Sequence, residues 1–233
     1  TTAVGQAATT ATEMERYLKA AQERTGLVPQ APVSPPQATE PDAAAPKPAT
    51  EGEQASTASA SELFDESMLA QLNAVFERMA NPLVLSLHLD ERPVSSEIEG
   101  YMGELAKLTD KLTVKHADTS ADGEAELPYV EVCRADGTAT GLAFHGVPGG
   151  HEFTSFVLGL YNAAGPGQPI ADEDRAAIAG IDRHVRLRVL VGLSCTMCPE
   201  VVTAAQRIAA DNAKVTADVY DINHFEGLKD QYN

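Results

Sequence analysis

Two cysteines separated by two residues are the feature of this 233-residue sequence that is best suited to chemistry. The segment around them reads Val189-Leu190-Val191-Gly192-Leu193-Ser194-Cys195-Thr196-Met197-Cys198-Pro199. Its apolar start predicts a strand, and Pro199 suits the first turn of a following helix, where backbone N–H groups have no partner within the helix. Those N–H groups and the positive end of the helix dipole favour a thiolate, the species that attacks a disulfide. The spacing therefore predicts thiol–disulfide exchange between Cys195 and Cys198.

Two other interpretations of the cysteine pair stay open on the sequence alone. A zinc site needs two more ligands at similar spacing, whereas Cys133 is isolated and the six histidines are scattered. A buried and inert pair of thiols would also satisfy the pattern. Redox exchange is favoured because a C-x-x-C between a strand and a helix is a specific arrangement. Cys133 ends an alternating strand pattern and is expected to be structural.

Composition excludes several classes of function. Acidic residues outnumber basic ones 34 to 17, for a formal net charge of −17. Such a surface repels phosphate backbones and anionic lipids, so we expect neither a nucleic-acid nor a membrane partner. No apolar run approaches the roughly 20 residues that span a bilayer. Three cysteines cannot build a disulfide framework, which favours a reducing, cytoplasmic location.

The chain divides by composition into four segments. Residues 26–62 are rich in Pro and Ala and predict a disordered linker, with a short segment, 1–25, before it. Residues 63–166 predict a helix, then β-α-β and β-β-α, and residues 167–233 begin a second round that stops early. Periodicity predicts helices over 69–79, 98–108, 153–160, 172–181, 201–208 and 225–232, and strands over 83–89, 112–117, 129–133, 142–145, 185–191 and 215–220. Ser96 and Glu99 form a candidate capping box, and Val201 is expected on the inner side of its helix.

Residues 66–233 resemble the N-terminal redox module of the bacterial alkyl hydroperoxide reductase flavoprotein subunit. The resemblance rests on Gly150-His151-Glu152-Phe153-Thr154-Ser155, Leu193-Ser194-Cys195, Cys198-Pro199, Val201-Val202, Leu89-Asp90 and Glu97-Ile98. It implies an α/β fold made of two thioredoxin-like units in tandem, the second incomplete here, with the cysteines in the second unit alone. The Thr196-Met197 pair departs from the polar pair usual in that family.

The resemblance also implies roles for individual residues. Cys195 would be the nucleophile, Cys198 the resolving thiol, and Glu152 a buried acid near them that handles protons. Glu152 could instead simply cap the helix that begins at Phe153. Pro128 falls where thioredoxin-like folds place a cis-proline.

The first 18 residues resemble the closing segment of thioredoxin reductase-like flavoproteins, through Thr2, Gly5, Ala11 and the string Glu15-Arg16-Tyr17-Leu18. The segments 1–25, 26–62, 63–166 and 167–233 would then be a flavin domain's tail, a linker and the two thioredoxin-like units. The parent would be a homodimer that uses FAD and NAD(P)H, with the flavin-binding residues outside this sequence. We expect this sequence to bind neither cofactor by itself and to hold no metal.

Three functions follow from these expectations. In the first, the chain passes electrons from the flavin domain of the same chain through Cys195 and Cys198 to a peroxiredoxin, for peroxide detoxification. In the second, it is a general protein disulfide oxidoreductase or glutaredoxin-like reductase. In the third, it is a docking module without catalysis.

Overall fold

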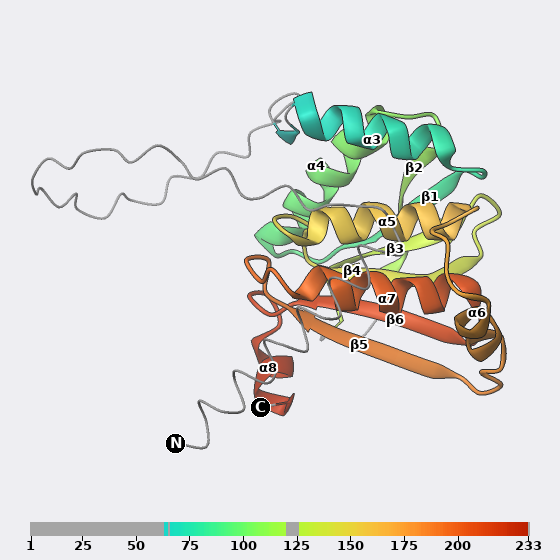
Figure 1. Cartoon of the computed structure of the whole chain (residues 1–233). Helices are drawn as coiled ribbons and strands as arrows, with labels where there is room; N and C mark the ends of the chain where they lie inside the picture. Colours follow the sequence, from blue (N-terminus) through green and yellow to red (C-terminus); the bar gives the residue numbers. More distant parts are fainter. Residues whose placement is uncertain (1–62, 65, 120–125, 233) are drawn as a thin grey trace, which may run out of the picture. The chain divides into compact units, whose positions relative to one another are not determined.

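The computed structural model describes residues 63–64, 66–119 and 126–232, and the predicted tail and linker lie outside them (Figure 1). Its helices are α3 (Glu66–Arg78), α4 (Pro93–Lys107), α5 (Glu152–Ala164), α6 (Asp172–Ala179), α7 (Cys198–Asp211) and α8 (Glu226–Tyr232). Its strands are β1 (Leu83–His88), β2 (Leu112–His116), β3 (Tyr129–Arg134), β4 (Ala139–His145), β5 (Val185–Val191) and β6 (Val215–Asp221). These elements confirm the predicted α/β class, with boundaries that differ by a few residues.

The six strands form one sheet in the order β2-β1-β3-β4-β6-β5. Strand β1 runs parallel to β2 and antiparallel to β3, and β3 runs antiparallel to β4. With α4 between β1 and β2 and α5 after β4, this is the predicted thioredoxin-like arrangement. Strand β6 then pairs in parallel with both β4 and β5, so the two strands of segment 167–233 extend the same sheet. A sheet of two strands is marginal by itself, and the shared edge supplies the missing neighbour.

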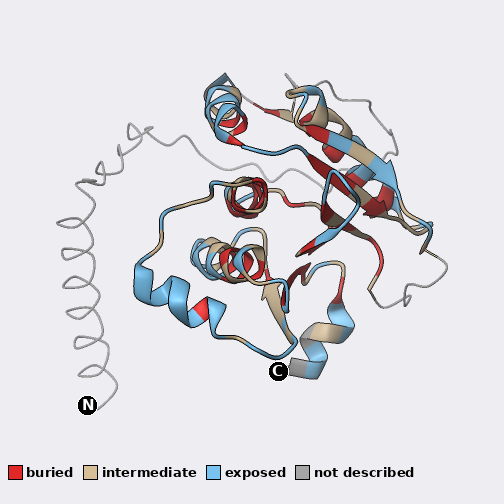
Figure 2. Ribbon diagram, turned by 90° about the vertical axis from the view of Figure 1, so that its right-hand side faces the viewer, coloured by how far each residue is buried: buried red, intermediate tan, exposed pale blue. Residues whose placement is uncertain are grey.

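Helices α3, α5 and α7 lie side by side on one face of this sheet (Figures 1 and 2). Alternate strand residues point into this layer, including Leu85, Val130, Phe144 and Val219, all at most 1% exposed. Helix α5 packs against both α3 and α7, and nine of its 13 residues are buried. Because α5 is packed between α3 and α7, its contact with α7 holds the start of α7 in place.

A row of four rings lies on the opposite face of the sheet. His88, Tyr129, His145 and Tyr220 are cross-strand neighbours on β1, β3, β4 and β6. Successive ring centroids are 4.2, 4.7 and 3.9 Å apart. Such cross-strand pairs stabilise a sheet, and this row crosses from segment 63–166 into segment 167–233.

Two local predictions are wrong. Helix α4 begins at Pro93, three residues before the predicted cap at Ser96, because proline suits the first helical position. Helix α7 buries Val202, Ala205 and Ala209, a spacing that turns Val201 outward with 59% of its surface exposed.

Candidate active site at the Cys195–Cys198 disulfide

The two cysteines lie where strand β5 leads into helix α7, as predicted. Cys195 and Cys198 are joined in a disulfide, with their Cα atoms 5.6 Å apart. Cys195 lies in the connecting loop, whereas Cys198 is the first residue of α7. Both cysteines are half-buried, so the bond lies at the surface of the protein. This position allows a second disulfide or thiol to approach the pair.

Backbone groups at the helix start surround the sulfur of Cys195. The N–H of Cys198 donates a hydrogen bond to Cys195 Sγ over 3.1 Å. The N–H of Cys195 donates to the carbonyl of Gly192 over 2.8 Å, which holds the loop in a turn. A donor from the first turn of a helix stabilises negative charge on the sulfur once the disulfide is opened. This N–H is placed to stabilise a thiolate at Cys195, and the role of Cys195 as nucleophile stays a prediction.

Two apolar side chains lie exposed beside the disulfide. Among the described residues, Met197 and Val201 are the large hydrophobic side chains that are exposed, at 60% and 59%. Met197 stands between the cysteines, and Val201 follows within the first turn of α7. Exposed apolar side chains that lie together often mark a surface that contacts another protein.

Glu152 is completely buried at the start of α5. Its Oε2 lies 2.5 Å from the hydroxyl of Ser155, and its Oε1 has no hydrogen-bond partner in the part of the chain that the structure describes. Burial raises the pKa of this carboxyl, and the Ser155 hydrogen bond and the charge of His151 offset only part of that rise. The helix begins at Glu152 itself, with His151 at the N-cap position, so Glu152 lies in the first turn, where an acidic residue also suits the helix dipole. Both roles considered for Glu152 stay predictions.

The loop before α5 packs directly on the loop before Cys195. The N–H of His151 donates to the carbonyl of Leu193 over 3.0 Å. Gly150 has a φ of +56°, and a Cβ there would lie 2.6 Å from the same carbonyl oxygen. The close approach therefore requires glycine. It brings the segment that carries Glu152 against the loop that carries Cys195.

Cys133 is separate from this site, on strand β3. It is buried and free, and its sulfur lies 3.5 Å from a carboxylate oxygen of Glu131. Burial, followed by the negative charge of Glu131, raises the pKa of the thiol to about 12. Such a thiol is a poor nucleophile at neutral pH, consistent with the structural role predicted.

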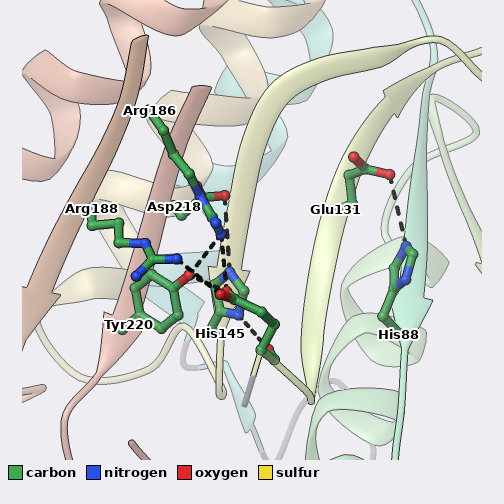
Figure 3. Close-up of polar contacts among 8 residues, drawn as sticks. His88, Glu131, His145, Arg186, Arg188, Asp218 and Tyr220 are labelled. Atoms are coloured by element: carbon green, nitrogen blue, oxygen red, sulfur yellow. Dashed lines mark hydrogen bonds and ion pairs between the residues drawn. The ribbon is translucent and has the colours of Figure 1, made fainter. Parts of the chain in front are cut away.

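A charged cluster on the opposite sheet face was not anticipated from the sequence (Figure 3). Arg186 and Arg188 of β5 both donate to the carboxylate of Glu126, over 2.9 and 3.0 Å. Arg186 also donates to Asp218 over 2.5 Å, and Tyr220 donates to Glu126. The alternation of charged residues along β5 was visible in the sequence, but nothing local indicated that the loop residue Glu126 would meet them.

Two classes of site are not found within the described ranges. Residues 63–64, 66–119 and 126–232 contain no group of three or more His, Cys, Asp or Glu side chains placed to hold a metal ion. No helix in those ranges is both long enough and apolar enough to cross a bilayer.

Comparison with known proteins gives consistent relatives. No family model matches the sequence. The chain is 32% identical over 154 residues to the F subunit of alkyl hydroperoxide reductase from Pseudomonas aeruginosa, a match that covers 66% of the chain and 28% of that protein. It is 29% identical over 159 residues to a Bacillus subtilis protein named NADH dehydrogenase, covering 68% of the chain and 30% of that protein. The matched part thus spans less than a third of these relatives.

Solved structures extend the comparison to the fold. The crystal structure of the NTD_N/C domain of alkylhydroperoxide reductase AhpF from Enterococcus faecalis is 35% identical, with a TM-score of 0.67. The match covers 72% of this chain and 84% of that one. A protein disulfide oxidoreductase from Aeropyrum pernix, 16% identical with a TM-score of 0.62 over 72% of this chain and 79% of that one, shares the fold.

Proposed function

Because the chain belongs to the family of alkyl hydroperoxide reductase F subunits, we propose that it is the dithiol-carrying module of a flavoprotein that reduces a peroxiredoxin. The observation that carries the proposal is the Cys195–Cys198 disulfide at the start of α7, with a helix N–H on the sulfur of Cys195. In this proposal Cys195, Cys198 and Glu152 keep the roles that the resemblance implies.

The electrons of the exchange pass between two pairs of sulfurs. In the reduced chain, the Cys195 thiolate attacks one sulfur of the partner disulfide, whose S–S bond breaks and whose other sulfur leaves as a thiolate that takes up a proton. Cys198 loses its proton and attacks Cys195, which releases the second partner thiol and forms the Cys195–Cys198 bond. Two electrons pass to the partner, whose two sulfurs take up the proton released by Cys198 and one proton from the surroundings. The chain is then reduced again by a dithiol of the flavin domain in the full protein.

The glycine-rich loop before α5 does not offer the phosphate site that a flavin or a nicotinamide dinucleotide needs. Such cofactors place their phosphates on a glycine-rich loop at a helix N-terminus. The glycine-rich loop 146–150 does precede α5, but the carbonyl of Leu193 occupies the space beside Gly150. We therefore place FAD and NAD(P)H on a flavin domain of the full protein.

The domain order is also part of the proposal. Segment 1–25 would be the tail of the flavin domain, 26–62 a flexible linker, and 63–166 and 167–233 two thioredoxin-like units on one shared sheet. A tether keeps the dithiol at high effective concentration while it visits the flavin domain and the partner. The full protein would be a cytoplasmic homodimer.

The direct test is Cys195→Ser in the full-length protein. We expect this variant to lose peroxiredoxin reduction while the flavin is still reduced by NAD(P)H, because the electrons reach the flavin before they reach Cys195. Peroxiredoxin reduction at the original rate in the variant would contradict the proposal. Equal activity of the unmodified protein toward insulin disulfides and a purified peroxiredoxin would instead indicate a general disulfide oxidoreductase.

A further inference from the structure

The hydroxyl of Ser155 contacts two oxygens of Glu152. It lies 2.9 Å from the backbone carbonyl oxygen of Glu152 and 2.5 Å from Oε2 of its side chain. A hydroxyl carries one proton, so it can donate to one of these oxygens at a time. The contact with the other oxygen needs a proton from elsewhere or has to be given up. Two arrangements satisfy this rule, and they differ in the charge of Glu152.

With a neutral carboxyl, the acid proton of Glu152 is donated to Ser155, and Ser155 donates to the backbone carbonyl. With an ionised carboxyl, Ser155 turns its proton toward the carboxylate. A hydrogen bond to a charged acceptor is stronger than one between neutral groups. Ser155 therefore has a partner in both states, and it favours the ionised one.

The surroundings make this hydrogen bond decisive for the charge of Glu152. Glu152 and Ser155 both have no exposed surface, and the second carboxylate oxygen, Oε1, has no partner among the described residues. Without Ser155 an ionised Glu152 would be a buried charge with no side-chain donor within those ranges. Such a charge is strongly disfavoured.

Ser155 also borders the start of the cysteine-bearing helix. It lines a cavity of about 440 Å³ between α5 and α7, whose other walls include Pro199, Thr203 and Arg207. Pro199 directly follows Cys198. The pair Glu152–Ser155 thus lies between the loop packed on Leu193 and a cavity that reaches the first turn of α7.

We propose that Ser155 is a positioning residue that allows Glu152 to give up and regain a proton as the disulfide opens and closes. The inference rests on the proposed function and on the role proposed there for Glu152. When an attacking thiolate opens the Cys195–Cys198 bond, the sulfur that leaves carries a negative charge and takes the proton of Glu152. Ser155 then donates to the carboxylate that remains. When the bond forms again, the proton lost by the thiol returns to Glu152.

Among the described residues, the other titratable groups near α5 do not take over the role of Ser155 as hydrogen-bond donor to the Glu152 carboxyl. Within the described ranges, His151 is the residue whose charge acts on Glu152, and it favours the carboxylate. Charged or titratable groups on the elements packed against α5 are exposed, bound to other partners or on the far sheet face. They are Glu66, Glu77 and Arg78 on α3; Tyr129, Glu131, Cys133 and Arg134 on β3; His145 on β4; and, besides the disulfide-bonded Cys198, Glu200, Arg207 and Asp211 on α7. Tyr101 of α4 lies against Phe153, and burial raises its pKa.

The test compares Ser155→Ala with Thr154→Ala in the full chain. Thr154 is the neighbouring residue with an exposed hydroxyl, so its variant removes the same group without touching Glu152. Infrared difference spectra follow the neutral carboxyl band of Glu152, identified by its loss in Glu152→Gln. Alkylation of the thiols released from Cys195 and Cys198 measures, at each pH, the rate at which dithiothreitol opens the disulfide.

For Ser155→Ala we expect the ionisation midpoint of Glu152 to rise by about one pH unit or more, because a hydrogen bond to a charged group is lost. We expect the disulfide to open about three- to tenfold more slowly at neutral pH, since a less acidic carboxyl transfers its proton less readily. Thr154→Ala should match the unmodified chain in both measurements, and Ser155→Thr should restore much of the lost rate.

An unchanged midpoint and rate in Ser155→Ala would show that Ser155 only fills space. The unmodified chain provides a test that needs no variant, because a Glu152 already ionised at pH 5 would also overturn the inference. A failure of the proposed function can be distinguished from both of these outcomes for Ser155 and Glu152. If the full-length protein does not reduce a peroxiredoxin, the titration of Glu152 and the rate with dithiothreitol can still be read.

Discussion

The surface next to Cys195 restricts which partners can reach it. A mixed disulfide requires a partner sulfur to bond to Cys195, and we expect partner residues beside that sulfur to contact the exposed Met197 and Val201. These two side chains are apolar in a chain whose formal charge is −17. Apolar contact gives the acidic module a way to bind a partner that does not depend on opposite charge. We therefore expect apolar residues beside the disulfide of the proposed peroxiredoxin.

The first prediction concerns Val201→Thr, which keeps the shape of the side chain and replaces a methyl group by a hydroxyl. In the full-length protein we expect KM for the peroxiredoxin to rise about three- to tenfold, because the hydroxyl must lose water on contact. Turnover of a small disulfide such as dithiobis(nitrobenzoate) by this variant should be unchanged. Thr196→Ser is the control, since it alters an exposed neighbour without changing polarity. An unchanged KM in Val201→Thr would place the partner elsewhere.

At the scale of elements, the site depends on two loops that come from distant parts of the chain. The loop before α5 ends at His151, and the loop after β5 contains Leu193, and a backbone hydrogen bond of 3.0 Å joins them. Because α5 and α7 follow these loops directly, the contact fixes the starts of both helices. It therefore supports both the position of Glu152 and the turn that contains Cys195.

The second prediction uses two glycines with positive φ to isolate this contact. Gly150→Ala should lower the free energy of unfolding by about 2–4 kcal/mol, because alanine is strained at that φ and its Cβ meets the carbonyl of Leu193. Gly137 also has a positive φ, of +86°, but a Cβ there would have no described atom within 4 Å, so Gly137→Ala should cost about 1–2 kcal/mol. Urea unfolding monitored by circular dichroism gives both values. Equal losses in the two variants would show that the contact with Leu193 contributes nothing.

For the whole molecule, sequence periodicity predicted the strands and helices well because their patterns are local. The strand at 185–191 and the position of the cysteines at its end are examples. The pairing of β4 with β6 could not be predicted in this way, since no local signal distinguishes a free edge from a shared one. The contacts of Glu126 with Arg186 and Arg188 were missed for the same reason, because they join residues about 60 positions apart. Tertiary contacts of this kind turn two predicted segments into one sheet.

The third prediction concerns the cluster that spans the two segments. Burial alone would raise the pKa of Glu126 and of Asp218. For Glu126 the hydrogen bond from Tyr220 and the charges of Arg186 and Arg188 outweigh burial. For Asp218 the nearby imidazole of His145, 3.9 Å away, and the hydrogen bond from Arg186 do so. Both pKa values are therefore lowered in the folded protein. A carboxylate of this kind stabilises the fold above its unfolded pKa, near 4.5 for Glu126 and 3.8 for Asp218, and that stability is lost as pH falls through the folded value.

We accordingly expect Glu126→Gln to lower the free energy of unfolding by about 1–2 kcal/mol at pH 7, a modest value because the cluster is partly exposed. The loss should shrink as pH falls below about 4.5, where the unmodified protein loses the same contribution. Glu97→Gln on the exposed side of α4 is the control, because it changes the net charge equally without touching the cluster.

The pH dependence that buried Glu152 gives to stability has the opposite sign. Its raised pKa favours the fold at low pH, and that contribution declines as pH rises through the folded value. Urea unfolding between pH 3 and 8 separates the two trends, and parallel curves for Glu126→Gln and Glu97→Gln would show that the cluster does not hold the two segments together.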